Sequence, residues 1–158
     1  VIENTGASGF YHIWVTFRLG EFYLDYAEAA LNATKSGYSV PSGCSMTAAQ
    51  AINMVRKRAG QPDIATGLSY DAFKKKYENE RFVELAFEGH RFYDLRRWKE
   101  APEYLKTIRK MTITKNDDGT LTFAPGVLET RQWKDAWYLF PLPQKDVLNC
   151  GYQQNPGY

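Results

Sequence analysis

The stretch ENERFVELAFEGHRFYDLRRW, residues 78–98, constrains the fold of this chain more than any other part of the sequence. It carries five acidic residues, four arginines and one histidine among large apolar side chains. A carboxylate buried without a cation or backbone donors is costly, so such charges are either paired with one another or kept for chemistry. The stretch therefore predicts either a buried structural charge network or a catalytic group of carboxylates.

The structural interpretation follows from helical periodicity. A long helix is expected from Tyr70 to at least Phe87, and Glu80, Glu84 and Glu88 share one side of it. Because apolar residues occupy nearly all sides, we expect the helix to be buried nearly all round and these glutamates to face protein. Arginines of the same stretch, whose planar guanidinium groups suit bidentate pairing, are the expected partners. The expected charge network consists of Glu80, Arg81, Glu84, Glu88, Arg91, Asp94 and Arg97.

The catalytic alternative is a glycosidase that uses Glu80, Glu84 and Glu88, because many glycoside hydrolases act through paired carboxylates. A general acid needs a raised pKa, whereas nearby arginines favour the ionised form of a carboxylate. His90 has no serine or cysteine motif to activate, and we expect it to be packed or hydrogen-bonded. These residues favour the structural interpretation, and we expect no catalytic site in this chain.

The rest of the chain predicts a mainly α-helical fold. Apolar residues at spacings of three and four predict a first helix over 17–34, and a capping box of Thr47 and Gln50 predicts a second helix up to Ala59. This pair has the length of a tetratricopeptide-type helical hairpin, whose faces need neighbouring helices to be buried. The long helix is expected to kink at Gly89 and to continue as a further helical segment to Trp98.

The C-terminal part predicts shorter elements. A short helix is expected over 102–108, and the stretch MTITKNDDGTLTF, residues 111–123, predicts a small β-hairpin around Asn-Asp-Asp-Gly. Residues 133–140 are aromatic and predict an extended segment, and residues 141–149 predict a short helix that begins at a proline. Residues 151–158 predict a tail without regular structure. No linker-like composition divides the chain.

The composition is that of a soluble globular protein, with 44% hydrophobic and 24% charged residues and a net charge of +2. So small a charge does not indicate nucleic-acid binding, and no run of lysines or arginines suggests a face that follows a phosphate backbone. Cys44 and Cys150 form no metal-binding pattern and the chain has two histidines, so we expect no metal and no cofactor. No apolar run reaches the length of a membrane span, and we expect no signal peptide within these residues. The start at Val1, without an initiator Met, predicts a mature product or a fragment.

Aromatic residues make up 15% of the chain and suggest one binding surface. Tyr11 and Trp14 lie in a Gly-rich segment outside any helical stripe, and they are the residues that we expect to stack on a ligand. Tyr26, Phe82 and Trp98 belong to apolar stripes and are expected in the core. The later aromatic residues are expected to serve packing: Trp133, Trp137 and Tyr138.

Three blocks of the sequence resemble the C-terminal portion of SusD/RagB-type proteins, the nutrient-binding surface lipoproteins of Bacteroidota. The blocks occur in the family's order and cover nearly the whole chain. The first is FRLGEFYLDYAEAALNA, with Arg18, Glu21, Tyr26, Ala27, Glu28 and Ala29. The second is the opening stretch, with Glu80, Arg81, Glu84, Leu85, Glu88, Gly89, Arg91, Asp94, Leu95, Arg97 and Trp98. The third is YLFPLPQKDVLNCGYQQNPGY, with Pro141, Pro143, Gln154, Asn155, Pro156, Gly157 and Tyr158.

This resemblance implies a mainly α, SusD-like superhelix of tetratricopeptide-like hairpins, with a small β-hairpin and long loops. Residues 1–158 would be the C-terminal part of a single SusD-like domain, with the N-terminal anchor and most repeats outside this chain. The protein would be no enzyme. It would capture oligosaccharide, or in some relatives peptide, as a lid on a SusC-type TonB-dependent transporter. It would lie on the surface of the outer membrane, lipid-anchored through an N-terminal Cys not present in this chain.

Two alternatives to nutrient capture stay open from the residues. A helical-repeat scaffold for protein partners would use the same hairpins, and a glycosidase would use Glu80, Glu84 and Glu88. The remainder of the SusD-like chain is a further expected partner, because a single repeat cannot bury both of its faces. No nucleic-acid partner is expected.

Overall fold

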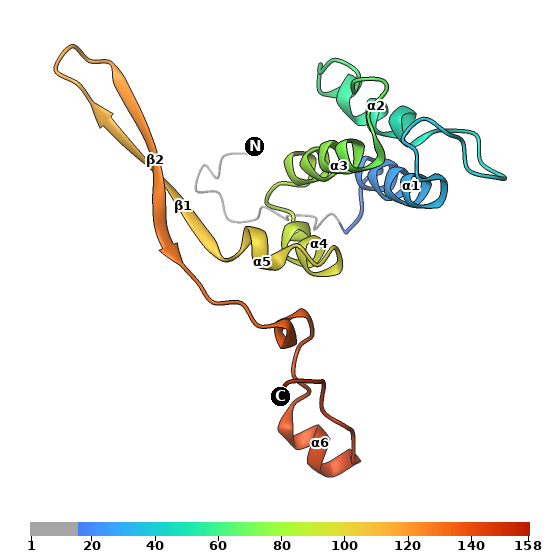
Figure 1. Cartoon of the computed structure of the whole chain (residues 1–158), viewed down its shortest axis with the longest axis vertical. Coiled ribbons are helices and arrows are strands. Elements are labelled where there is room, and N and C mark those ends of the chain that lie inside the picture. Colours follow the sequence, from blue (N-terminus) through green and yellow to red (C-terminus); the bar gives the residue numbers. More distant parts are fainter. Residues whose placement is uncertain (1–15) are drawn as a thin grey trace, which may run out of the picture. The chain divides into compact units, whose positions relative to one another are not determined.

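A computed structural model describes residues 16–158 of the chain. It confirms a mainly helical fold with a small two-stranded antiparallel sheet (Figure 1). The chain divides into two compact units, of which the first ends at Glu88 and the second runs from Gly89 to Tyr158. No linker-like composition marks this boundary, so the division emerges from the structure alone. Within the described residues, no helix has both the length and the apolar character to cross a membrane.

The described part of the first unit contains α1 (Leu19–Thr34), α2 (Ala48–Arg58) and α3 (Tyr70–Glu84). The expected capping box starts α2, since the Gln50 amide donates to Thr47 Oγ1 (3.1 Å) and the Thr47 amide donates to Gln50 Oε1 (2.8 Å). The Ser69 hydroxyl caps α3 by accepting from the Ala72 amide. These caps satisfy amide groups that have no acceptor inside the helix.

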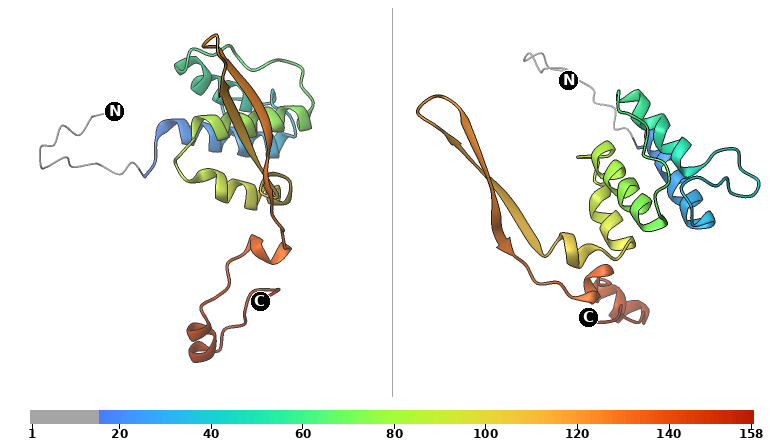
Figure 2. Two further views of the ribbon diagram at one scale, coloured as in Figure 1. Left: turned by 90° about the vertical axis from the view of Figure 1, so that its left-hand side faces the viewer. Right: turned by 45° about the horizontal axis from the view of Figure 1, so that its top comes forward.

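Side-chain hydrogen bonds show that α3 runs antiparallel to α1. Tyr70, at the start of α3, donates to Asn32 Oδ1 near the end of α1 (2.9 Å). Tyr77, two turns later, donates to Glu28 Oε2 (2.6 Å), which lies one turn earlier in α1. The two helices therefore lie side by side in opposite directions, and α2 contacts both of them (Figure 2).

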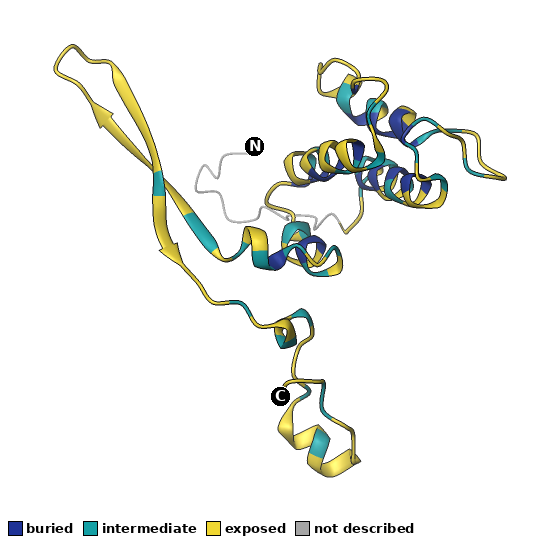
Figure 3. Ribbon diagram, viewed as in Figure 1, coloured by how far each residue is buried: buried dark blue, intermediate teal, exposed yellow. Residues whose placement is uncertain are grey.

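The core of the first unit lies between these three helices (Figure 3). Alanines on α1 and α2 let the two backbones approach closely, and the large rings of Phe73 and Tyr77 fill the space beside α3. Gly37, in the loop after α1, lies so close to Phe73 that a Cβ there would be 2.2 Å from two ring carbons. The buried apolar residues include Leu24, Ala27, Ala30, Leu31, Ala48, Ala51, Ile52, Val55, Phe73 and Tyr77.

The third helix differs from the sequence-based expectation at its C-terminal end. It ends at Glu84 instead of reaching Phe87, whose side chain is fully exposed and whose backbone is left-handed (φ 66°). Phe82 and Val83 are exposed as well, so the prediction of a helix buried nearly all round, with Phe82 in the core, was wrong. Periodicity gives the direction of each side chain, but not which directions meet another element. The described helices cover the Tyr77 side of α3.

The second unit contains shorter elements: α4 (His90–Arg97), α5 (Ala101–Tyr104), β1 (Thr107–Lys115), β2 (Leu121–Thr130), the 3-10 helix η1 (Asp135–Tyr138) and α6 (Gln144–Cys150). The hairpin is confirmed, but it extends well beyond 111–123 at both ends. Strand pairing begins at Thr107, so the helix expected over 102–108 is limited to α5. The segment 133–140, expected to be extended, contains η1.

The hairpin β1–β2 has a well-organised turn and two unlike faces. At the turn, the Asp118 carboxylate accepts from the hydroxyl (2.6 Å) and the amide (2.9 Å) of Thr120. These hydrogen bonds lower the pKa of Asp118 below its ordinary value. Because side chains alternate between faces along each strand, one face gathers exposed apolar residues of both strands. They are Met111, Ile113, Leu121, Phe123 and Val127.

The C-terminal tail, residues 151–158, lacks regular structure, as the sequence predicts, but it is held in place. The Gln154 side chain accepts from the Leu142 amide (2.7 Å) and donates to the Leu142 carbonyl oxygen (2.9 Å). Gly157 has a left-handed backbone (φ 92°), and a Cβ there would be 2.6 Å from Ala136 Cβ. The tail is therefore bound to the segment that runs from η1 toward α6.

Candidate functional site

Glu84, at the end of α3, is the centre of a charge network in the first unit. Arg18, just before α1, and Arg58, at the end of α2, reach its carboxylate at 2.5 and 2.7 Å. Arg18 Nε also donates to both carboxylate oxygens of Glu88 (2.8 and 3.0 Å). Gly20 leaves room for this arrangement, because a Cβ there would be 2.8 Å from Arg18 Nη1. One carboxylate thus connects the ends of all three helices.

The burial of these partners is unequal. The Glu84 side chain is 9% exposed, whereas that of Arg58 is 65% exposed. The hydrogen bond with Glu88 raises the pKa of Arg18 above its ordinary value; burial acts against this, and Glu84 adds to it. Arg18 is therefore a permanent cation, and it is the more sheltered of the two partners of Glu84.

Two further ion pairs connect α3 with its neighbours. Glu80 binds Arg56 of α2, and Arg81 binds Asp25 of α1 at 2.6 Å. The cations on Glu80 and Glu84 thus come from α2 and from the start of α1, and not from the arginines of residues 78–98, as the sequence suggested. A helix brings together only residues three or four apart, so helix packing, which sequence spacing does not reveal, decides these pairs.

The remaining members of the expected network lie in the second unit. Asp94 pairs with Arg97 one turn along α4 at 2.9 Å. The Arg97 guanidinium also lies 4.8 Å from the ring centroid of Trp98, which is partly exposed and not in the core as expected. Arg91 lies over the Tyr104 ring at 4.7 Å. These charges therefore organise α4 and the turn that follows it.

Glu80 and Glu84 are held by arginines in a way that does not suit acid–base chemistry. Both oxygens of Glu84 accept from guanidinium groups, and Glu80 is held by Arg56. Such charge-assisted hydrogen bonds fix a carboxylate as an acceptor, so neither residue is placed to give a proton to a substrate. In the part of the chain that the structure describes, no group of three or more His, Cys, Asp or Glu side chains could hold a metal ion.

The two expected ligand-binding residues, Tyr11 and Trp14, lie outside the described residues. The structure instead brings together an aromatic group in the second unit, of which Trp133, Trp137 and Tyr138 were expected to serve packing. We call it the Arg96 cluster: Phe92, Arg96, Trp133, Trp137, Tyr138 and Phe140.

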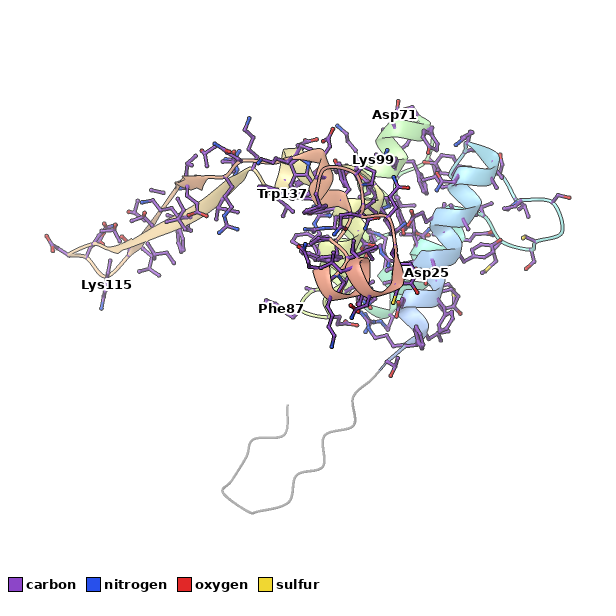
Figure 4. The ribbon with its side chains drawn as sticks, turned by 90° about the horizontal axis from the view of Figure 1, so that it is seen from below. Asp25, Asp71, Phe87, Lys99, Lys115 and Trp137 are labelled. Carbon is purple, nitrogen blue, oxygen red and sulfur yellow. The ribbon has the colours of Figure 1, made fainter. Side chains whose placement is uncertain are left out.

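The Arg96 cluster is built around one guanidinium group. The Arg96 guanidinium carbon lies 3.4 Å from the ring centroid of Phe92 and 5.7 Å from that of Trp133. Trp133 meets Trp137 and Tyr138 edge to face, at centroid distances of 5.9 and 5.0 Å. Figure 4 shows the side chains, with Trp137 labelled. Phe92 and Arg96 are four residues apart on one helix, and this was the one signal in the sequence that could have indicated the cluster.

Comparison with known proteins gives a consistent result. A sequence model of the SusD family matches residues 3–158. The chain is 31% identical over 144 residues to SusD-like protein P2 of Formosa agariphila, a match that covers 84% of this chain and 25% of that protein. The chain therefore spans a quarter of the length of the curated relative that it matches. No solved structure matches it.

Proposed function

This chain belongs to the SusD family, and from that membership we propose that it forms part of a non-catalytic receptor for oligosaccharide nutrients. The receptor captures its ligand at the cell surface and delivers it to a TonB-dependent transporter of the SusC type in the outer membrane. It is held at that membrane by an N-terminal lipid anchor. The chain supplies the C-terminal part of the receptor, and the remainder of the SusD-like chain is its partner.

The observation that carries this proposal is the family match over residues 3–158. The geometry of the acidic residues supports the part of the proposal that the receptor is not an enzyme. Glu80 is paired with Arg56, and Glu84 is paired with Arg18 and Arg58. In this proposal the network is structural and fixes the three helices of the first unit. Tyr11 and Trp14 are proposed to stack on the ligand, since flat rings suit the apolar face of a sugar.

Affinity electrophoresis of the full-length protein in gels containing laminarin, polygalacturonate or carrageenan tests glycan capture. We expect at least one polymer to retard the protein, with no release of reducing ends in solution. Retardation by none of them, together with binding of a casein peptide digest, would support peptide capture. Release of reducing ends that is lost in Glu84→Gln would establish the glycosidase instead.

The delivery step has its own measurement. We expect the full-length receptor to copurify in detergent with a TonB-dependent barrel from the native outer membrane. A receptor that binds a glycan and isolates without any barrel would contradict delivery while leaving capture intact. A receptor that binds neither glycan nor peptide, yet copurifies with other proteins, would favour the helical-repeat scaffold.

The assignment of Trp14 is tested by a matched pair of variants. We expect Trp14→Ala to weaken glycan retardation with little change in melting temperature. Trp98→Ala should lower the melting temperature and leave retardation in place, because Trp98 is partly buried beside Arg97. If Trp14→Ala unfolds the protein and leaves glycan affinity unchanged, Trp14 is a core residue.

A further inference from the structure

The Arg96 cluster joins two parts of the second unit that are distant in sequence. Phe92 and Arg96 come from α4, and Phe140 lies beyond η1. The Phe92 and Phe140 rings are nearly parallel, at 24°, with centroids 6.1 Å apart. The Arg96 guanidinium carbon lies 6.0 Å from the Phe140 centroid, so the cation is close to both rings.

The cluster presents flat apolar surface to solvent. Phe140 is 61% exposed, Phe92 41% and Trp137 37%. Rings from two segments that gather in one exposed place form a contiguous apolar patch, and such a patch, unlike singly scattered apolar residues, indicates a binding surface. Exposed rings beside a cation form the kind of surface on which the apolar face of a sugar stacks.

Arg96 differs from its neighbour Arg97 in its partners. Arg97 is paired with Asp94, whereas the hydrogen bond that Arg96 makes within the described residues goes to the Phe92 carbonyl oxygen (3.1 Å). In this part of the chain no carboxylate forms an ion pair with Arg96, and its Nε and the Trp133 indole N–H are buried without an acceptor. A guanidinium whose planar donors are not matched by a carboxylate is equipped to bind an anionic group.

We propose that the Arg96 cluster is a subsite for an acidic sugar unit, one that carries a carboxylate or a sulfate group. The proposal rests on the proposed function, because it names the chemistry of the oligosaccharide that the receptor captures. The exposed Trp137 and Phe140 rings stack on the sugar, and Arg96 binds its anionic group. Such a site combines apolar surface with one placed charge.

The test measures binding of the full-length protein to polygalacturonate, which carries carboxylates, to carrageenan, which carries sulfates, and to neutral laminarin. We expect one anionic polymer to bind, more weakly as salt is added, and Arg96→Gln to lower its affinity by about tenfold, as loss of a charged hydrogen bond does. Phe140→Ala should also weaken binding of the same polymer. Arg109→Gln removes the same charge from the exposed hairpin strand β1 and should change nothing. The difference between the two anionic polymers tells carboxylate from sulfate recognition.

Each outcome decides the inference. Laminarin binding alone leaves glycan capture standing and overturns the acidic subsite. Binding of no polymer overturns the subsite together with the proposed glycan capture. Anionic binding that is equally strong in Arg96→Gln and Arg109→Gln, with both variants melting as the parent does, also overturns the subsite. If Arg96→Gln melts at a lower temperature than the parent, the affinity of Phe140→Ala for the anionic polymer is the test, because that exposed ring can be removed with little effect on the fold. Unchanged affinity in Phe140→Ala would then overturn the subsite.

Discussion

The two units of this chain differ in how they hold themselves together. In the first unit, rings and aliphatic side chains from three helices share a core, and Arg18, Arg56, Arg58 and Arg81 tie the helices to one another. In the second unit, Leu95 and Ala101 are the buried apolar residues among those described, and the hairpin has a row of apolar side chains in solvent. The first unit therefore has the means to fold by itself.

The second unit, by contrast, contains little buried apolar surface of its own among the described residues. A two-stranded hairpin is marginally stable in water unless further strands or a helix pack on it, and within residues 16–158 β1–β2 has no third strand. Local hydrogen bonds hold two parts of the second unit. Asp118 fixes the hairpin turn, and Gln154 holds the C-terminal tail to Leu142. We expect such a unit to be ordered locally and to depend on further contacts for its stability. The predictions below test this difference between the units.

The largest expected effect comes from removing a core ring of the first unit. Phe73 is 0% exposed, so Phe73→Ala should lower the free energy of unfolding by about 3–5 kcal/mol. Phe123, on the hairpin, is 57% exposed, and Phe123→Ala should change it by no more than about 0.5 kcal/mol. Urea denaturation of both variants measures the pair. Equal losses would show that the hairpin face is as well packed as the helical core.

Glycine substitution gives the next largest difference. A methyl group at Gly37 would overlap the Phe73 ring, so Gly37→Ala should cost about 3 kcal/mol, the upper end of the usual range for overpacking. The matched substitution is Gly126→Ala in β2, where a Cβ would meet nothing closer than 3.6 Å and where we expect no loss. Thermal melting compares them. A Gly37→Ala protein that melts like the parent would mean that the loop after α1 is not held against Phe73.

The ion pairs give a smaller difference. Glu84→Gln should lower the free energy of unfolding by about 1–3 kcal/mol. The loss is smaller than for a fully buried pair, because Arg58 is exposed to solvent and Arg18 retains its ion pair with Glu88. Glu129→Gln removes the exposed partner of Arg131 in the second unit and should have almost no effect. A double-mutant cycle with Arg18→Gln isolates the pair energy. A coupling energy near zero between Arg18 and Glu84 would contradict the structural role of the network.

The smallest expected effect concerns the hairpin turn. The pKa of Asp118 is lowered in the folded turn, so its ionised form stabilises the turn at pH values above the ordinary carboxyl pKa. This contribution should be lost as the pH falls through the lowered pKa, and the Thr120 amide resonance should shift with it in an NMR titration. In Asp118→Asn the shift should vanish. A Thr120 resonance that titrates in the same way in that variant would exclude Asp118 as the cause.

Local signals in the sequence predicted much of this fold. The Thr47–Gln50 capping box marked the start of α2, and β-prone residues on either side of Asn-Asp-Asp-Gly marked the hairpin. Both depend on residues within a few positions of one another, so a single sequence contains the whole signal. The tail of residues 151–158 was expected to be irregular for the same reason, although its attachment to Leu142 was not expected.

What the sequence could not show depends on packing between distant segments. Glu84 was recognised as a buried carboxylate, but its partners Arg18 and Arg58 lie 66 and 26 residues away, and no spacing rule connects them. Phe82 was expected in the core because its helix is apolar on several sides, and the structure leaves it exposed. The Arg96 cluster was missed because it joins α4 to the segment around η1.

Hydrogen exchange of backbone amides along the 158-residue chain tests the difference between the units most directly. If the first unit has its own core, amides of buried residues such as Leu24, Ile52 and Tyr77 should exchange slowly, through global unfolding of that unit. Amides of β1 and β2 should exchange orders of magnitude faster, because the hairpin opens locally. Equal protection of the three helices and the hairpin would contradict the account, since it would mean that both units unfold as one cooperative structure.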